Sequence, residues 1–171
     1  DAVTATANAN AGVMGHTVEV TQAATNAYLM TATSQIGRAG TPGSTKLRDI
    51  AFSGGARPGG MLDGDTALKF KVSNGTGSAE VSFTAEEIFT KNLTLNDLAN
   101  RINNARYTDS SGKKTSLNIR ANYDSVSDGF SLANSKTGTN NKIDLTVDTT
   151  SSSASYTTTL LNNMNLGVVS N

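Results

Sequence analysis

Short runs of alternating apolar and polar residues, separated by turn-forming residues, recur along the chain. The clearest case combines alternation at residues 68–72 (Leu-Lys-Phe-Lys-Val), a turn at residues 74–77 (Asn-Gly-Thr-Gly) and renewed alternation at residues 79–83. A strand places successive side chains on opposite faces, so a period of two indicates a strand with one buried face. The pattern predicts an antiparallel hairpin here and favours folds rich in such strands.

The same pattern predicts a second hairpin near the start of the chain. Residues 3–9 alternate, residues 12–15 contain two glycines that suit a turn, and alternation resumes at Val18 and Val20. Residues 28–32 either extend this second strand or form another strand, and the pattern alone leaves both possibilities open.

Three more alternating runs occupy residues 117–123, 130–132 and 143–147. The economical interpretation is three antiparallel strands with one face packed on a helix. Residues 108–115 are polar and predict a loop before the first of these strands. Residues 149–155 form a Thr/Ser-rich tract, which predicts a loop without core residues.

Two segments have helical rather than strand spacing. Residues 95–105 place apolar side chains at intervals of three and four, with Thr94 positioned to cap the helix and Asp97 to reach back to it as in a capping box. Residues 160–164 predict a second short helix, which ends at Gly167 because glycine readily adopts the left-handed conformation of a helix C-terminus.

Glycine, together with both prolines of the chain, is concentrated in residues 37–64, which predicts loops around a short ordered segment at 47–52. A boundary near Pro42 would give two small subdomains, 1–42 and 43–171, the first a strand-hairpin segment. The fold class predicted from these patterns is α+β and mainly β, with antiparallel strands and hairpins and one or two short helices.

The composition argues against several classes of function. Lys and Arg number 14 and so do Asp and Glu, so the zero net charge, without a basic block, argues against nucleic-acid binding. No apolar run is long enough for membrane insertion. The chain has no cysteine, and its one histidine, His16, cannot form a multi-histidine metal site. Residues 1–10 lack the charged and apolar regions of a signal peptide.

Two Gly-containing segments have partial matches to binding motifs. Asp63-Gly64-Asp65 looks like the start of a calcium loop, but Asn74 stands where its final acidic ligand belongs, so a structural turn is the better interpretation. Gly75-Thr76-Gly77 has neither the third glycine nor the strand-to-helix context of a phosphate loop, and a hairpin turn is favoured. We therefore expect no metal and no cofactor.

The remaining polar motifs do not predict catalysis, and we expect no enzyme activity. Glu86-Glu87 are sequence neighbours whose side chains diverge, so a solvated face is the default, and His16 has no identifiable Ser and Asp partners. Lys113-Lys114 are too few for a nucleic-acid groove and suit a solvated loop tip. The sequons that begin at Asn74 and Asn92 matter only in a cell that glycosylates asparagine.

Two groups of residues resemble signatures of a known protein family. Residues 3–7 (Val-Thr-Ala-Thr-Ala) and 15–24 (Gly-His-Thr-Val-Glu-Val-Thr-Gln-Ala-Ala) look like a small-residue strand followed by a Gly-aromatic-x-hydrophobic-x-Val-x-Gln-Leu-Ala stretch. His16 and Ala23 depart from that pattern, which more often has an aromatic residue and a leucine there. This stretch resembles the distal part of the bacterial flagellar filament cap proteins, the FliD family.

The second group resembles the flagellar "Ile-Asn" module, which flagellins and hook-junction proteins also carry. It comprises, in order, residues 93–103, 116–123, 128–132 and 134–141. In this module we expect Ile102 to be a core contact of the helix and Asn103 to satisfy backbone groups at the helix end. Both roles are structural, so the module indicates ancestry rather than catalysis.

The resemblance implies a structural assembly protein at the tip of an extracellular flagellum. Its partners would be flagellin, which the cap retains so that it folds and polymerises, and other copies of the chain in a cap ring. The 171 residues contain no sustained heptad pattern, so the helical segments that form most of the ring contacts would lie elsewhere in the full protein. We expect the chain alone to be a monomer or a weak oligomer.

Two alternatives keep the same fold. An adhesin would bind host mucin or glycans through the loops at residues 37–64 and 149–155. Its supply of aromatic side chains for sugar stacking is small: Tyr28, Tyr107, Tyr123 and Tyr156. The other alternative, an outer domain of a flagellin or of a hook-junction protein, would differ in the sequences that flank it.

Overall fold

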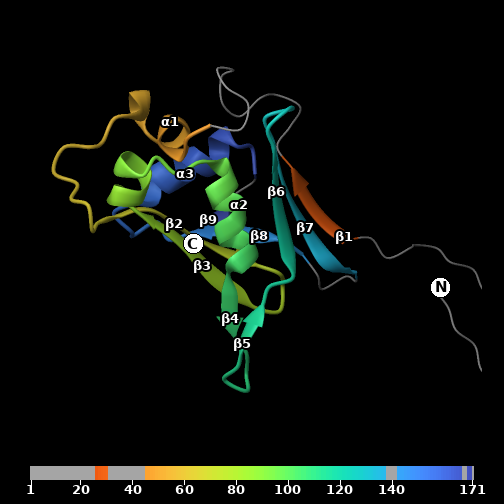
Figure 1. Ribbon diagram of the computed structural model, residues 1–171. Helices are drawn as coiled ribbons and strands as arrows, with labels where there is room; N and C mark the ends of the chain where they lie inside the picture. Colours follow the sequence, from red (N-terminus) through yellow and green to blue (C-terminus); the bar gives the residue numbers. More distant parts are fainter. Residues whose placement is uncertain (1–25, 31–44, 138–141, 167–168, 171) are drawn as a thin grey trace, which may run out of the picture.

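The computed structural model describes residues 26–30, 45–137, 142–166 and 169–170 (Figure 1). The predicted hairpin at residues 3–20, His16, Pro42 and Gly167 lie outside these described residues.

The elements bear out the predicted fold class, α+β and mainly β. In chain order they are β1 (Asn26–Met30), α1 (Leu47–Ala51), η1 (Ser53–Gly55), β2 (Thr66–Ser73), β3 (Ser78–Thr84), η2 (Glu86–Thr90), α2 (Leu95–Asn104), β4 (Arg106–Thr108), β5 (Lys114–Ser116), β6 (Ile119–Asp124), β7 (Gly129–Thr137), β8 (Asp144–Val147), α3 (Ala154–Asn163) and β9 (Val169–Ser170).

The larger sheet has the strand order β3-β2-β8-β9. The predicted hairpin is confirmed as β2 and β3, which pair antiparallel with Phe70 opposite Val81. β8 pairs antiparallel with β2, and β9 pairs parallel with β8. The alternation at residues 68–72 works as expected, because Leu68, Phe70 and Val72 are all buried whereas Lys71 is exposed.

The second sheet has the order β1-β7-β6, and it corrects one prediction. β6 and β7 form the expected antiparallel pair. The third predicted strand exists as β8, but it pairs with β2 in the other sheet, and β1 occupies the place beside β7. Alternation specifies which face of a strand is buried but not which strand lies beside it, so the pattern could not choose the partner.

The helices and both sheets share one hydrophobic core (Figure 1). Its fully buried aromatic side chains are Phe70, Phe83 and Phe130, which come from β2, β3 and β7. The short segment predicted at residues 47–52 is α1 and the residue after it; Phe52 stacks on Tyr156 of α3, with 4.6 Å between ring centroids. The elements therefore pack as layers around a common interior.

The predicted loop at residues 149–155 is wrong in its second half. Ser153 is fully buried and α3 begins at Ala154. The Ser153 carbonyl accepts hydrogen bonds from the Thr157 backbone N–H and hydroxyl, and that hydroxyl accepts the Lys69 backbone N–H at 2.9 Å. Short polar side chains can join a core when their hydrogen bonds are satisfied, which composition alone does not reveal.

The end of α3 also differs from the prediction. Asn165, with φ of 54°, takes the left-handed position expected for Gly167. The Asn165 N–H bonds to the Asn162 carbonyl and the Leu166 N–H to the Leu161 carbonyl, and Leu166 is buried beside the helix. This is the Schellman arrangement, in which asparagine can replace glycine.

The polar loop predicted at residues 108–115 contains part of a small hairpin, β4 and β5. Its turn is organised by Asp109, whose carboxylate accepts the Ser111 and Lys113 backbone N–H groups and the Thr115 hydroxyl. At its base, Tyr107 packs on Gly77, where any Cβ would overlap the tyrosine ring. Lys113 and Lys114 are exposed.

The subdomain boundary near residue 42 stays a prediction. β1, from the first predicted subdomain, pairs along its length with β7, from the second. Residues from both predicted parts thus contribute to one sheet.

Candidate functional site

α2 carries the residues of the "Ile-Asn" resemblance, and its first turn forms as predicted. The Asp97 carboxylate accepts the Thr94 backbone N–H and the Thr94 hydroxyl, both at 2.8 Å. Leu95, Leu98 and Ile102 turn into the core. The capping interaction and this apolar stripe fix where the helix starts and which face it buries.

Arg101 joins α2 to the outer edge of β3. Its Nη1 donates to the Ser82 carbonyl at 2.6 Å, and its two terminal nitrogens bind the Glu87 carboxylate at 2.7 and 3.1 Å. The guanidinium also lies over the Phe83 ring, 4.3 Å from its centroid. Glu87 in turn accepts the Thr84 backbone N–H at 2.9 Å, so the ion pair occupies two backbone groups of β3.

Glu87 is therefore more than the solvated residue that the sequence suggested. The hydrogen bond from Arg101 holds the pKa of the Glu87 carboxyl below its ordinary value, against the opposing effect of desolvation. Its neighbour Glu86 diverges, as expected, and pairs with Lys91 at 3.4 Å. The two carboxylates are in separate ion pairs, an arrangement unlike an acid/base pair facing one substrate.

Asn103 joins α2 to β6, which corrects the expected role at the helix end. Its Nδ2 donates to the Ala121 carbonyl at 2.9 Å, and its Oδ1 accepts the Ala121 N–H at 2.7 Å. β6 is a terminal strand of its sheet, so one amide side chain makes both bonds that a neighbouring strand would make to Ala121. The helix end is served instead by Arg106, which donates to the Asn103 and Ala105 carbonyls.

The segment Arg101-Ile102-Asn103 thus acts as a connector between the two larger sheets. Figure 1 shows α2, the helix that carries it. Arg101 binds the β3 edge, Ile102 is buried with 2% exposure, and Asn103 binds the β6 edge. Each polar side chain of this connector binds either backbone groups or the Glu87 carboxylate. These contacts hold α2 against both sheets and so stabilise the fold.

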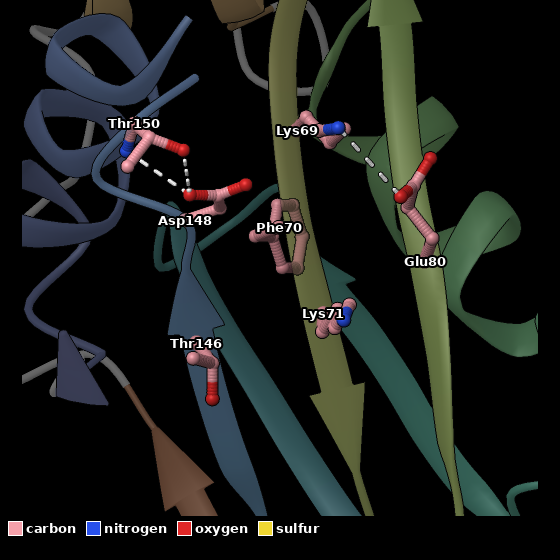
Figure 2. Close-up of a pocket in the computed structure, with 7 residues that line it drawn as sticks. All are labelled: Lys69, Phe70, Lys71, Glu80, Thr146, Asp148 and Thr150. Carbon is pink, nitrogen blue, oxygen red and sulfur yellow. Dashed lines mark hydrogen bonds and ion pairs between the residues drawn. The ribbon is translucent and has the colours of Figure 1, made fainter. Parts of the chain in front are cut away.

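A separate groove of about 440 Å³ lies on the outer face of the larger sheet. Figure 2 shows Lys69 on β2 facing Glu80 on the neighbouring strand β3. Asp148 and Thr150 lie on the other flank of β2, beside the end of β8. The Lys69 Nζ lies 3.9 Å from the Glu80 carboxylate. The groove is lined by Lys69, Phe70, Lys71, Glu80, Thr146, Asp148 and Thr150.

The charges in this groove are of both signs. Asp148 accepts the Thr150 hydroxyl at 2.7 Å and its backbone N–H at 3.0 Å. These bonds, helped by the nearby charges of Lys69 and Lys71, hold the pKa of the Asp148 carboxyl below its ordinary value. The groove offers ammonium, carboxylate and hydroxyl groups, which suit a polar ligand or water equally well.

Sequence reasoning missed this groove. The alternation around Lys69 and Lys71 indicated that both face outward, but Asp148 and Thr150 come from a segment far along the chain. The signal needed was the pairing of β8 with β2, and that pairing was predicted wrongly.

The two segments with partial binding motifs form turns. In the first, Asp63 pairs with Arg57 at 2.8 Å, and Asp65 accepts the Leu62 N–H at 2.7 Å. Within the described ranges, no three His, Cys, Asp or Glu side chains gather as metal ligands would.

The second turn is organised by Asn74. Its Oδ1 accepts the Thr76 and Gly77 N–H groups and its Nδ2 donates to the Leu117 carbonyl, while the residue is 2% exposed. The asparagine of this sequon is therefore buried, whereas Gly75 and Thr76 are exposed in the turn. In the other sequon, the Asn92 side chain donates to the Thr90 carbonyl at 3.1 Å.

The tyrosines offered for sugar stacking are mostly engaged in packing. Tyr107 packs on Gly77, and Tyr156 stacks on Phe52. Tyr123 is buried and donates to Asp128 at 2.5 Å; this burial, reinforced by Asp128, raises the pKa of the Tyr123 phenol. Tyr28, at 55% exposure, remains accessible on β1.

Comparisons with protein-family models, curated proteins and solved structures found no match to this chain. Among the helices that the structure describes, none combines the length and hydropathy needed to cross a bilayer.

Proposed function

We propose that this chain is a non-catalytic structural module: the exposed outer part of an extracellular flagellar filament cap, which keeps exported flagellin at the filament tip while it folds and polymerises. In this role the module acts with flagellin and with other copies of the cap subunit, through segments mostly outside these residues, and needs no cofactor.

The observation that carries the proposal is the connector in α2. The signature that resembles flagellar axial proteins falls on Arg101-Ile102-Asn103, and these residues bind two sheet edges to one core. A cap works at the end of a growing filament, where exposed sheet edges could pair with incoming subunits. Closing edges with side chains is a known protection against such pairing.

The proposal is tested in cells whose own copy of this protein lacks residues 1–171. They are compared with unaltered cells, with cells lacking the whole gene, and with cells carrying Asn100→Ala. Asn100 is an exposed α2 residue outside the connector, so this variant controls for manipulation of the gene. Export of the shortened protein is checked by immunoblotting, and flagellin is measured in the medium and in filaments.

We expect flagellin monomer in the medium and short or absent filaments from the shortened copy, despite its export at normal levels. Normal filaments with normal flagellin retention would overturn the proposal. Cells carrying Asn100→Ala should match unaltered cells, because that side chain is exposed and is not one of the connector residues.

A second candidate, binding of host glycans, is favoured by one feature, the groove of Figure 2. Lys71 and Asp148 could exchange hydrogen bonds with sugar hydroxyls, although the engaged tyrosines leave little aromatic surface for stacking. Lys71→Ala with Asp148→Asn should then abolish attachment to mucin-coated surfaces, whereas Lys114→Ala, on the distant hairpin, should not. Unchanged attachment in the double variant would rule out this groove as a glycan site.

A further inference from the structure

The outer faces of the two larger sheets differ in apolar exposure. The groove face of β2, β3 and β8 presents Lys71, Glu80 and Asp148 to solvent. The outer face of β1, β7 and β6 presents Tyr28 and Met30, which are 55% and 58% exposed. Side-by-side exposed apolar residues of this size on a strand are typical of a contact surface.

The register of β1, β7 and β6 arranges this face in cross-strand rows. One row consists of Tyr28, Ala133 and Arg120, and the next of Met30, Ser131 and Asn122. A third row contains Gly129 and Asp124. Arg120, Asn122 and Asp124 are all exposed, so the β6 end of each row is available for contact.

The rows are self-complementary under a twofold rotation. If the axis lies across the strands at the Met30-Ser131-Asn122 row, that row faces itself in a second copy. The row that contains Arg120 then faces the row that contains Asp124 in the partner. In the same way, Asp124 of the first copy faces Arg120 of the second. Such an arrangement gives two opposite-charge pairs at the β6 end of the rows, on either side of Asn122, while Met30 faces its own copy at the β1 end. Each contact is made twice, as isologous interfaces require.

Asp124 is held in the charged form that this pairing needs. Its carboxylate accepts the Val126 backbone N–H at 2.9 Å and the Ser127 hydroxyl at 2.6 Å. These bonds keep the pKa of the Asp124 carboxyl below its ordinary value. Arg120 and Asp124 lie four residues apart on one strand, about 13 Å, so neither neutralises the other within one copy.

We propose that the outer face of β1, β7 and β6 docks on a second copy of this chain, face to face about a twofold axis, with Arg120 opposite Asp124. The contact is weak, because the exposed apolar area is centred on two side chains. This inference stands independently of the flagellar proposal, since it rests on the strand register, the exposed apolar side chains and the charges of this face.

The first test is sedimentation of the purified 171-residue chain over a range of concentrations. The wild-type chain should dimerise, and Met30→Lys and Arg120→Glu should each raise the dimer dissociation constant on the order of tenfold or more. Lys71→Glu makes the same charge change on the outer face of the larger sheet. This variant should leave the dimer dissociation constant unchanged. Circular dichroism checks that each variant folds.

Two outcomes would overturn the proposal: a wild-type chain that stays monomeric at every concentration, or a Lys71→Glu variant weakened as much as Arg120→Glu. A monomeric chain whose binding to purified flagellin is lost with Met30→Lys would assign the face to flagellin instead.

A second test uses the absence of cysteine from the chain. Asn122→Cys places a single thiol on the proposed axis, so two copies should be joined efficiently by a short bismaleimide cross-linker. Glu80→Cys, on the outer face of the larger sheet, should give little cross-linked dimer. Equal yields from the two variants would contradict the twofold arrangement.

Discussion

α2 binds two sheet edges by different chemistry. At β3 it uses Arg101, a charged side chain held by Glu87, and at β6 it uses Asn103, a neutral amide. The β3 contact depends on ionisation and is open to screening by salt, whereas the β6 contact depends only on hydrogen-bond geometry. The comparison teaches that one helix can close two sheet edges through contacts that differ in their response to pH and salt.

The largest effect should come from the buried residue that separates the two contact residues in the sequence. Ile102 is a core residue with 2% exposure, and Ile102→Ala should lower the free energy of unfolding by about 2–5 kcal/mol through lost burial and a cavity. Urea titration measures this loss, with Ile102→Val as the milder control. A loss no larger than that of Asn103→Ala would show that polar contacts, rather than burial, dominate the connector.

Removing the β6 contact should cause the next largest loss of unfolding free energy. Asn103→Ala leaves the Ala121 N–H and carbonyl without their partner and should cost roughly 2 kcal/mol of unfolding free energy. Asn100→Ala, on the exposed side of the same helix, is the matched control and should change stability little. Equal effects of the two substitutions would contradict the role given to Asn103.

The β3 contact should be weaker and sensitive to salt. Arg101→Met keeps an apolar stem near Phe83 but removes the ion pair, and should cost about 1–2 kcal/mol at low ionic strength. Thermal unfolding at low and high salt should show this deficit shrinking, while the Asn103→Ala deficit stays constant. A parallel salt response of both variants would remove the distinction between the two edges.

The smallest effect concerns pH. The lowered pKa of Glu87 means that its ionised form stabilises the fold above the unfolded-state pKa, and that this contribution is lost as pH falls through the folded-state pKa. The stability difference between wild type and Glu87→Gln should therefore be largest near neutral pH and narrow below the ordinary carboxyl pKa. Urea titrations from pH 7 to pH 3 measure it, and a difference that does not vary with pH would contradict the ion pair.

Local patterns predicted much of this fold, because their physics is local. The capping interaction of Thr94 with Asp97 and the hairpin turn at Asn74 each depend on residues a few positions apart. The pairing of β8 with β2 and the contact of Asn103 with Ala121 depend on packing between distant segments. Asn103 was recognised as structural, but its position at the helix end suggested the wrong backbone partner.

The candidate sites were less accessible to sequence reasoning for the same reason. The groove brings Lys71 together with Asp148, and the face proposed for docking brings Met30 together with Asn122. Neither pair shares a motif, and each exists only once strand neighbours are known.

The most direct test of the two-edge connector is amide hydrogen exchange at Ala121 and Thr84 in the wild-type chain and in Asn103→Ala. Both N–H groups are bonded by side chains, Ala121 by Asn103 and Thr84 by Glu87. We predict that Asn103→Ala accelerates exchange at Ala121 far more than at Thr84. Equal acceleration at the two amides, or an unprotected Ala121 in the wild-type chain, would contradict the claim that Asn103 closes the β6 edge.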